Sequence, residues 1–323
     1  MTHTEYVNGY KPPLLFRNGH IQSIYPVLFR KIDSSFYERE RIDTPDGDFL
    51  DLDWSVTGCD RLAVISHGLE GNSCRAYVTG MAKTLNSAGW DVLAWNYRSC
   101  SGEPNRLLKS YHNGSTEDLS LVIQHAEKKK RYREIALVGF SLGGNLSLMH
   151  LGRDSADPIV TKAVVFSVPC DLKSSVETIS KPSNTIYMKR FLKMLHEKIR
   201  AKMEIMPGLI DDKGFEKIKT FREFDDRYTA PIHGFRDALD YWEKCSSKQF
   251  LSNIKVPVLI VNAADDPFLP GECYPDREAS ENPNITLEVP ESGGHVGFIE
   301  FNRENRYWSE KRAVSFLNSC MEK

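Results

Sequence analysis

Short, almost unbroken apolar runs are the feature that most limits how this chain can fold. "RLAVISHG", "DVLAWNYR", "EIALVGFS", "KAVVFSVP" and "VPVLIVNAADD" each contain such a run. Strands that are apolar on both faces are typical of parallel sheets covered by helices on both sides. Amphipathic segments such as "VTGMAKTLNSAGW" and "GGNLSLMHLG" lie between the runs. The alternation predicts an α/β fold with a mostly parallel central sheet and helices on both faces.

Turn and capping signals place the other elements. "ERERIDTPDGDFLDLDW" is predicted to form two strands joined by a turn at residues 45–47. Ser115 and Asp118 predict a capping box at the start of a helix that ends near residues 128–130. "ITLEVPESGG" predicts one more strand, and residues 308–320 the last helix.

The interval between Pro169 and Pro257 is too long for a simple connection, which usually takes about 2–6 residues plus a helix. Apolar residues recur within it at helical spacing: Met188, Leu192, Leu195, Ile199 and Met203. We therefore predict a single domain over residues 1–323, with an N-terminal extension at 1–36 and a helical cap inserted at about 170–250. The cap would cover the edge of the sheet at which such folds bind ligands.

Composition and charge limit the location and partners of the protein. Of the 323 residues, 41% are hydrophobic and 27% charged, and the formal net charge is −2, so no global charge attracts nucleic acid. The N-terminus lacks a signal-peptide pattern, and no stretch approaches the roughly 18 apolar residues of a membrane span. Seven scattered cysteines predict free thiols in a reducing compartment. We predict a cytoplasmic protein without a transmembrane segment or nucleic-acid partner, of unknown oligomeric state.

The motif "GFSLGG", at Gly139–Gly144, matches G-x-S-x-G between a predicted strand and a predicted helix. Glycines on both sides of Ser141 permit a sharp turn that exposes its hydroxyl above the sheet. The N-terminus of the following helix would favour a developing oxyanion. The motif therefore predicts Ser141 as a catalytic nucleophile, against the alternative of a structural glycine-rich turn.

A serine nucleophile needs a base, and His295 is the best placed of the nine histidines. It follows the last predicted strand in "PESGGHVGF", on a glycine-flexed loop that could reach over the sheet edge. His112 also lies in a predicted loop and stays open as an alternative. His67 lies in "SHGLEGN", the first loop after a core strand, and is predicted to shape that turn. In α/β-hydrolases this loop supplies one backbone N–H of the oxyanion hole. The predicted backbone donors are Leu69 and Leu142.

The adjacent carboxylates of "NAADDPFLP", Asp265 and Asp266, end a predicted strand between Ser141 and His295. This chain order, serine, acid, histidine, is that of α/β-hydrolases. A metal site would need further ligands that no other predicted strand end supplies, and neither a phosphate-binding loop nor HExxH is present. The pair therefore predicts a triad acid and no metal, without deciding between the two residues.

Together these motifs resemble the α/β-hydrolase superfamily, and more narrowly its YheT-like branch (the AB hydrolase 4 family), which includes the α/β-hydrolase-domain proteins one, three and fifteen. "RNGHIQSIYPVLFR", "HGLEGNS", "NYRSCSGEPN", "GFSLGGN", "FREFDDRYTAP" and "DDPFLP…GGHVGF" are similar to successive blocks of that branch. By the D-P-x-x-P pattern of the family, the acid is Asp266.

The resemblance implies a serine hydrolase that cleaves carboxylic esters through a Ser-His-Asp triad and an acyl-enzyme, without a cofactor. The substrate would be a small ester, lipid-like in some members, while the residues that bind it stay unknown. Acyl transfer, or cleavage of a thioester or amide, by the same triad is an alternative. A non-catalytic binding module on this fold is another.

The predicted cap helix is rich in cations. Residues 181–206 contain seven of them and two glutamates, and a basic amphipathic helix can lie on an anionic lipid surface. The seven are Lys181, Lys189, Arg190, Lys193, Lys198, Arg200 and Lys202. The simpler interpretation, which we favour, is a solvated helix whose apolar stripe faces the sheet.

Overall fold

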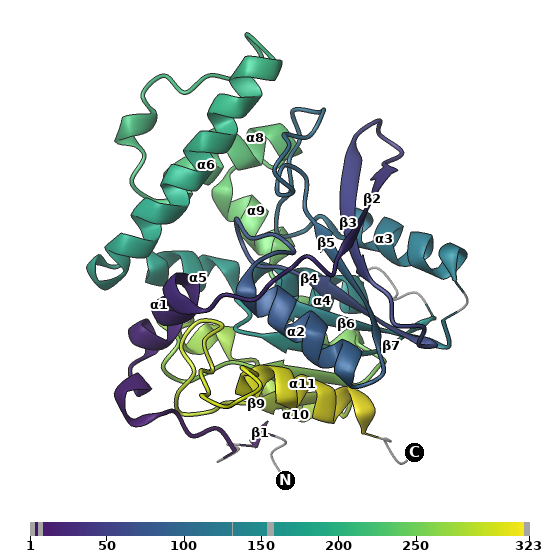
Figure 1. The fold of residues 1–323 in the computed structure, drawn as a ribbon. Coiled ribbons are helices and arrows are strands. Elements are labelled where there is room, and N and C mark those ends of the chain that lie inside the picture. The colour runs from purple at the N-terminus through teal and green to yellow at the C-terminus, as the bar shows by residue number, and fades with distance from the viewer. Residues whose placement is uncertain (1–3, 6–8, 131, 154–157, 320–323) are drawn as a thin grey trace.

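A computed structural model describes residues 4–5, 9–130, 132–153 and 158–319 (Figure 1). Over these residues the strands form one nine-stranded sheet in the order β1-β9-β8-β7-β6-β4-β5-β3-β2. Strand β3 runs antiparallel to β2 and β5, and all other pairs are parallel. The strands are β1 (Thr4–Glu5), β2 (Glu38–Asp43), β3 (Phe49–Ser55), β4 (Arg61–Ser66), β5 (Asp91–Asn96), β6 (Glu134–Phe140), β7 (Val160–Phe166), β8 (Val258–Val261) and β9 (Ile285–Glu288).

Helices cover both faces of this sheet, as predicted. α2 (Ala76–Ser87) and α11 (Trp308–Asn318) share one buried cluster, whereas α3 (Thr116–Lys129), α4 (Leu142–Arg153) and α10 (Asp276–Glu281) contribute to the other. Along β4, Leu62 and Val64 belong to one cluster and Ala63 and Ile65 to the other. Successive side chains of a strand point to opposite faces, so an unbroken apolar run fills two cores.

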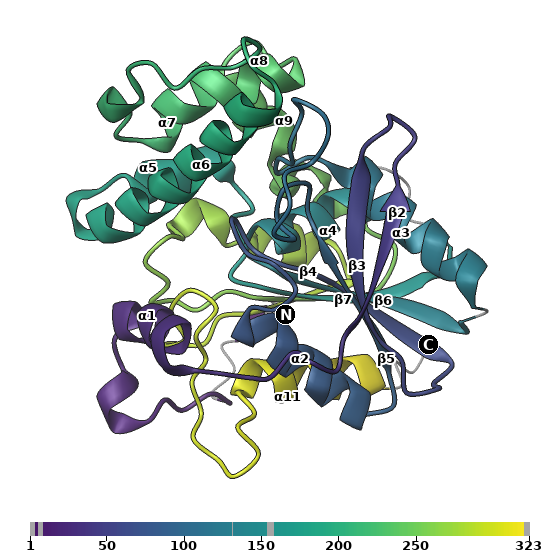
Figure 2. The same cartoon turned by 45° about the horizontal axis from the view of Figure 1, so that its top comes forward.

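Five α-helices lie between β7 and β8 and gather beyond one end of the sheet (Figure 2). They are α5 (Leu172–Ile179), α6 (Thr185–Ile205), α7 (Phe221–Phe224), α8 (Ala230–His233) and α9 (Ala238–Cys245). We call residues 170–250 the cap segment. The apolar stripe of α6 faces inward, since Met188, Leu192 and Ile199 are buried in a cluster with Phe268. The division into a single domain, an extension and a cap stays a prediction.

Two local details differ from the sequence-based expectations. Ser115 precedes α3 but makes no capping hydrogen bond, and its hydroxyl instead accepts from the N–H of His112. The predicted capping box is therefore wrong: Asp118 pairs with the guanidinium of Arg98 instead.

The N-terminal extension, for which no helix was predicted, contains α1 (Gly19–Phe29). The last helix ends at Asn318, and residue 320 lies outside the described part.

Within the described ranges, no helix combines the length and the apolar character that a membrane span requires.

Candidate active site

Ser141 occupies a strained turn between β6 and α4. Its backbone has φ 53°, a left-handed conformation that is rare for a residue with a side chain. Neighbouring glycines make the turn possible: a Cβ on Gly143 would lie 2.2 Å from the carbonyl oxygen of Ser66, and one on Gly139 2.6 Å from that of Gly143. The Ser141 N–H donates to the carbonyl of Phe166 at 2.9 Å, which fixes the turn to β7.

His295 lies on the loop after β9, and its Nε2 is 2.9 Å from Oγ of Ser141. The loop is held from the N-terminal extension, because the N–H of His295 donates to Oγ of Ser23 in α1 at 2.8 Å. The same serine hydroxyl donates to the carbonyl of Gly19. Two segments at opposite ends of the chain therefore determine where the imidazole lies.

Asp266 completes a line of three hydrogen-bonded side chains. Its Oδ2 lies 2.9 Å and its Oδ1 3.2 Å from Nδ1 of His295, and the carboxylate is fully buried. Oδ1 also accepts from the N–H of Phe268. A carboxylate accepts only, so Nδ1 carries the proton and the lone pair of Nε2 faces the hydroxyl of Ser141.

Asp265 has a different environment. Its Oδ1 accepts from the N–H of Gly294 at 2.8 Å, directly before His295, while its Oδ2 is buried without a hydrogen-bond partner. Burial, with a further contribution from the charge of Asp266, raises the pKa of Asp265 above its ordinary value. Gly19 packs against this residue, since a Cβ there would lie 1.9 Å from the carbonyl oxygen of Asp265. Among the described residues, no group of three His, Cys, Asp or Glu side chains is arranged to hold a metal ion.

The other candidate histidines do not contact Ser141. His67 is buried, its Nδ1 donates to the carbonyl of Gly68 at 2.8 Å, and its Nε2 accepts from the N–H of Tyr97. Burial lowers the pKa of His67 to about 3, so the ring is neutral. Nδ1 of His112 accepts from the N–H of Gly114. Both rings shape loops.

The turn after β4 lies against the nucleophile, where a Cβ on Gly68 would lie 3.3 Å from Cβ of Ser141. Most N–H groups of this turn are occupied: that of Gly68 donates to Tyr77, that of Glu70 to Tyr111, and that of Gly71 to the carbonyl of Gly68. In the described part of the chain, the N–H groups of Leu69 and Leu142 donate to no protein atom. Both residues line the cavity that contains Ser141.

A cavity of about 160 Å³ lies between the sheet and the cap segment, and Ser141 and His295 line it. Aliphatic and aromatic side chains make up most of its wall, and polar side chains, which include Glu70, Lys198, Lys202 and Asp225, make up the rest. The apolar lining includes Leu69, Val176, Phe191, Leu195, Ile199 and Phe268. These lining residues could not be predicted from the sequence, because they depend on how the cap segment packs on the sheet.

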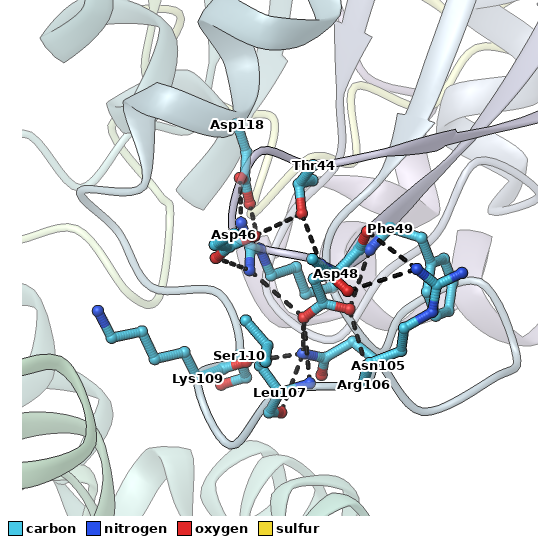
Figure 3. Close-up of polar contacts among 12 residues, drawn as sticks. Thr44, Asp46, Asp48, Phe49, Asn105, Arg106, Leu107, Lys109, Ser110 and Asp118 are labelled. Atoms are coloured by element: carbon cyan, nitrogen blue, oxygen red, sulfur yellow. Dashed lines mark hydrogen bonds and ion pairs between the residues drawn. The ribbon is translucent and has the colours of Figure 1, made fainter.

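The loop between β5 and α3 supplies another wall of the cavity, through Leu108, Ser110 and Tyr111. A buried polar network fixes its base (Figure 3). The carboxylate of Asp48 accepts from the N–H of Arg106 at 2.8 Å and from the side chains of Asn105 and Arg98. The Arg98 guanidinium in turn pairs with Asp46 and Asp118, each at 2.7 Å.

Two of the seven cations counted in the cap helix turn inward. The ammonium of Lys198 lies 2.9 Å from Oε1 of Glu70, and that of buried Lys202 donates to the carbonyls of Asn105 and Leu107. Burial lowers the pKa of Lys202 to about 8. The basic surface of the helix is therefore smaller than the sequence indicated, since two charges anchor it to loops of the sheet.

Comparisons with known proteins identify the family of the chain. A family profile described as the alpha/beta hydrolase fold matches residues 64–301. An esterase from Pyrococcus furiosus, Pf2001, has the same fold, with a TM-score of 0.59 over 88% of this chain and 93% of that one at 19% identity. The profile match covers most of the chain, so the chain belongs to the α/β-hydrolase family.

Two relatives define its branch. YheT of Escherichia coli (strain K12), named an esterase, is 36% identical over 95% of this chain and 92% of its own. A mouse protein named phospholipase ABHD3 is 31% identical over 82% of this chain and 67% of its own. The chain therefore belongs to the YheT-like branch, as the motifs predicted.

Proposed function

We propose that this protein is a serine esterase in which Ser141 is the nucleophile, His295 the general base and Asp266 the orienting acid. The observation that carries the proposal is the unbroken line of hydrogen bonds from the hydroxyl of Ser141 through His295 to the buried carboxylate of Asp266. A neutral imidazole with its proton on Nδ1 is the form that can accept the serine proton.

The proposed reaction has two halves. Oγ of Ser141 attacks the ester carbonyl while Nε2 of His295 takes its proton, and the same proton then passes to the leaving alcohol. The acyl group stays on Ser141 as an ester. His295 next removes a proton from a water molecule, the hydroxide attacks the acyl carbon, and the acid leaves as Ser141 regains its proton. Asp266 stabilises the imidazolium in both halves, and the reaction uses only side chains, backbone and water.

The proposed oxyanion donors are the N–H groups of Leu69 and Leu142. Their support is that both belong to turns packed around Ser141 and donate to no other atom in the part of the chain described here. The helix N-terminus at Leu142 adds a favourable dipole. A single such donor typically contributes about 10²–10³ in kcat.

The largely apolar lining of the cavity supports a substrate ester with an aliphatic or aromatic acyl group. The name of the mouse relative, a phospholipase, supports lipid-like esters as well. Acyl transfer to an alcohol by the same acyl-enzyme is the second candidate reaction.

Three further predictions stay open: contact of α6 with an anionic lipid surface, a cytoplasmic location, and a single domain with a cap segment. Cosedimentation with anionic vesicles tests the lipid contact.

The test is turnover of p-nitrophenyl esters of increasing acyl length by wild type and by Ser141→Ala, with and without a competing alcohol. We expect hydrolysis by wild type and a loss of at least about 10³ in the variant. Transesterified product in the presence of the alcohol would favour acyl transfer. Equal turnover by both proteins would overturn the proposal.

A further inference from the structure

Glu70 is the residue next to Leu69, and its position is determined from several sides. It is buried in a left-handed backbone conformation, φ 54°, which is uncommon for glutamate. Its N–H donates to the hydroxyl of Tyr111 at 3.0 Å, and that hydroxyl donates back to Oε1 of Glu70 at 2.6 Å. Its carbonyl accepts from Arg75. Residues are held in such conformations only where their surroundings require it.

The counter-charge of this carboxylate comes from the cap segment. Lys198, in the middle of α6, places its ammonium 2.9 Å from Oε1 of Glu70. The ammonium also lies 2.9 Å from Sγ of Cys100 and 4.7 Å from the centre of the Tyr111 ring. Burial opposes the charge on Lys198, but Cys100 and Glu70 outweigh it and raise its pKa. A helix beyond the end of the sheet (Figure 1) thus reaches the turn beside the nucleophile.

We propose that the Lys198–Glu70 ion pair positions the N–H of Leu69, so that the cap segment holds one half of the oxyanion hole in place. The inference rests on the proposed function. Both residues line the same cavity as Ser141 and His295, and in this proposal they act as positioning residues, because their effect on the reaction passes through the backbone of Leu69. Oxyanion donors act only at about 2.7–3.1 Å from the developing charge, so a small shift of the turn would lower the rate.

Removal of either charge leaves the other without its partner in a largely buried site, and we expect the turn that carries Glu70 to relax. Leu69 would then move from the oxyanion while the ground-state ester still enters the cavity. The expected signature is a fall in kcat with little change in KM, because the lost interaction exists only in the transition state.

The experiment compares Glu70→Gln, Lys198→Met and the double variant, using a short p-nitrophenyl ester and thermal unfolding. Each single variant should lose about 10- to 100-fold in kcat, with KM within about threefold. Since the two residues act as one unit, the double variant should lose no more than the worse single one. Glu70→Gln keeps the size of the side chain and its bond to Tyr111, so it tests the pair even if Lys198→Met fails to fold.

Another lysine of α6 is the control. Lys193→Met removes an exposed charge that, within the described residues, pairs with Glu197 at 3.9 Å, outside the cavity lining, and it should leave kcat unchanged. Lys202 does not serve as a control, because it lines the cavity and bonds to the loop that carries Tyr111, the partner of Glu70.

The outcomes separate this inference from the proposed function. Active wild type with kcat within twofold in both single variants would overturn the inference alone, as would equal losses in Lys198→Met and Lys193→Met. Additive losses in the double variant would also contradict it. Wild type without any esterase activity would overturn the proposed function, and the positioning role with it.

Discussion

Nδ1 of His295 lies 2.9 Å from Oδ2 of Asp266, whereas the adjacent Asp265 bonds to the backbone of Gly294. Asp266→Asn should therefore lower kcat by about 10³–10⁴, because an amide no longer fixes the proton on Nδ1. Asp265→Asn keeps an oxygen that can accept from Gly294 and should lose less than about tenfold. Steady-state kinetics of the two variants check this, and the reverse ranking would contradict it.

The N-terminal extension is expected to matter for activity through Gly19. A Cβ at this position would lie 1.9 Å from the carbonyl oxygen of Asp265, so Gly19→Ala must move α1 or the acid turn. We expect a loss of about 1–3 kcal/mol in the free energy of unfolding and a lower kcat. Gly271→Ala is the matched control, because no atom lies within 4 Å of its added Cβ. Equal behaviour of the two variants would contradict the role of Gly19.

Asp225 should make the stability of the protein depend on pH. It lines the cavity, accepts from Thr229 and Trp242, and burial raises its pKa from 3.8 to about 7. Between these two pKa values the folded carboxyl is protonated and the unfolded one ionised. The folded state therefore binds more protons, and its stability falls as pH rises through this window.

The variant Asp225→Asn isolates this effect. Its free energy of unfolding, measured in urea, should rise relative to wild type by roughly 2–3 kcal/mol between pH 5 and pH 8. The amide oxygen can still accept from Trp242. A constant difference between the two proteins across this range would show that Asp225 titrates normally.

Arg98 should be a major contributor to stability, because it is the cation of a buried network that includes Asp48 and Asp118 (Figure 3). Arg98→Met leaves these carboxylates without a counter-charge and should cost about 3–5 kcal/mol. Arg106, in the same loop, pairs with exposed Asp43, so Arg106→Met should cost less than about 1 kcal/mol. Urea unfolding measures both, and a small effect of Arg98→Met would contradict this account.

Much of the fold follows from local signals in the sequence. The run at Leu62–Ser66 predicted β4 because its four successive apolar residues before Ser66 are typical of a strand buried on both faces. Residues 139–144 predicted the strained turn at Ser141 because the glycines that the turn needs lie within the motif itself. An added Cβ on these glycines would collide with atoms of the same turn or of the neighbouring strand. The choice of Asp266 required a family pattern, since adjacent carboxylates look alike in sequence.

Contacts between distant segments could not be predicted in this way. Ser23 and Gly19 lie far along the chain from His295 and Asp265, and nothing in their own neighbourhood indicates that they contact the loops of these two residues. Lys198 and Lys202 were counted with the surface charges because charge predicts exposure. The side chains turn inward because they flank the apolar stripe of α6 and reach carboxylate or carbonyl oxygens.

The most direct test of the central claim is covalent labelling with a fluorophosphonate, followed by mass spectrometry of the modified peptide. We predict one adduct per chain, on Ser141, absent in Ser141→Ala and formed far more slowly in His295→Ala, since the hydroxyl reacts only when His295 can accept its proton. No adduct on wild type, an adduct on another residue, or equal labelling of wild type and Ser141→Ala would contradict it.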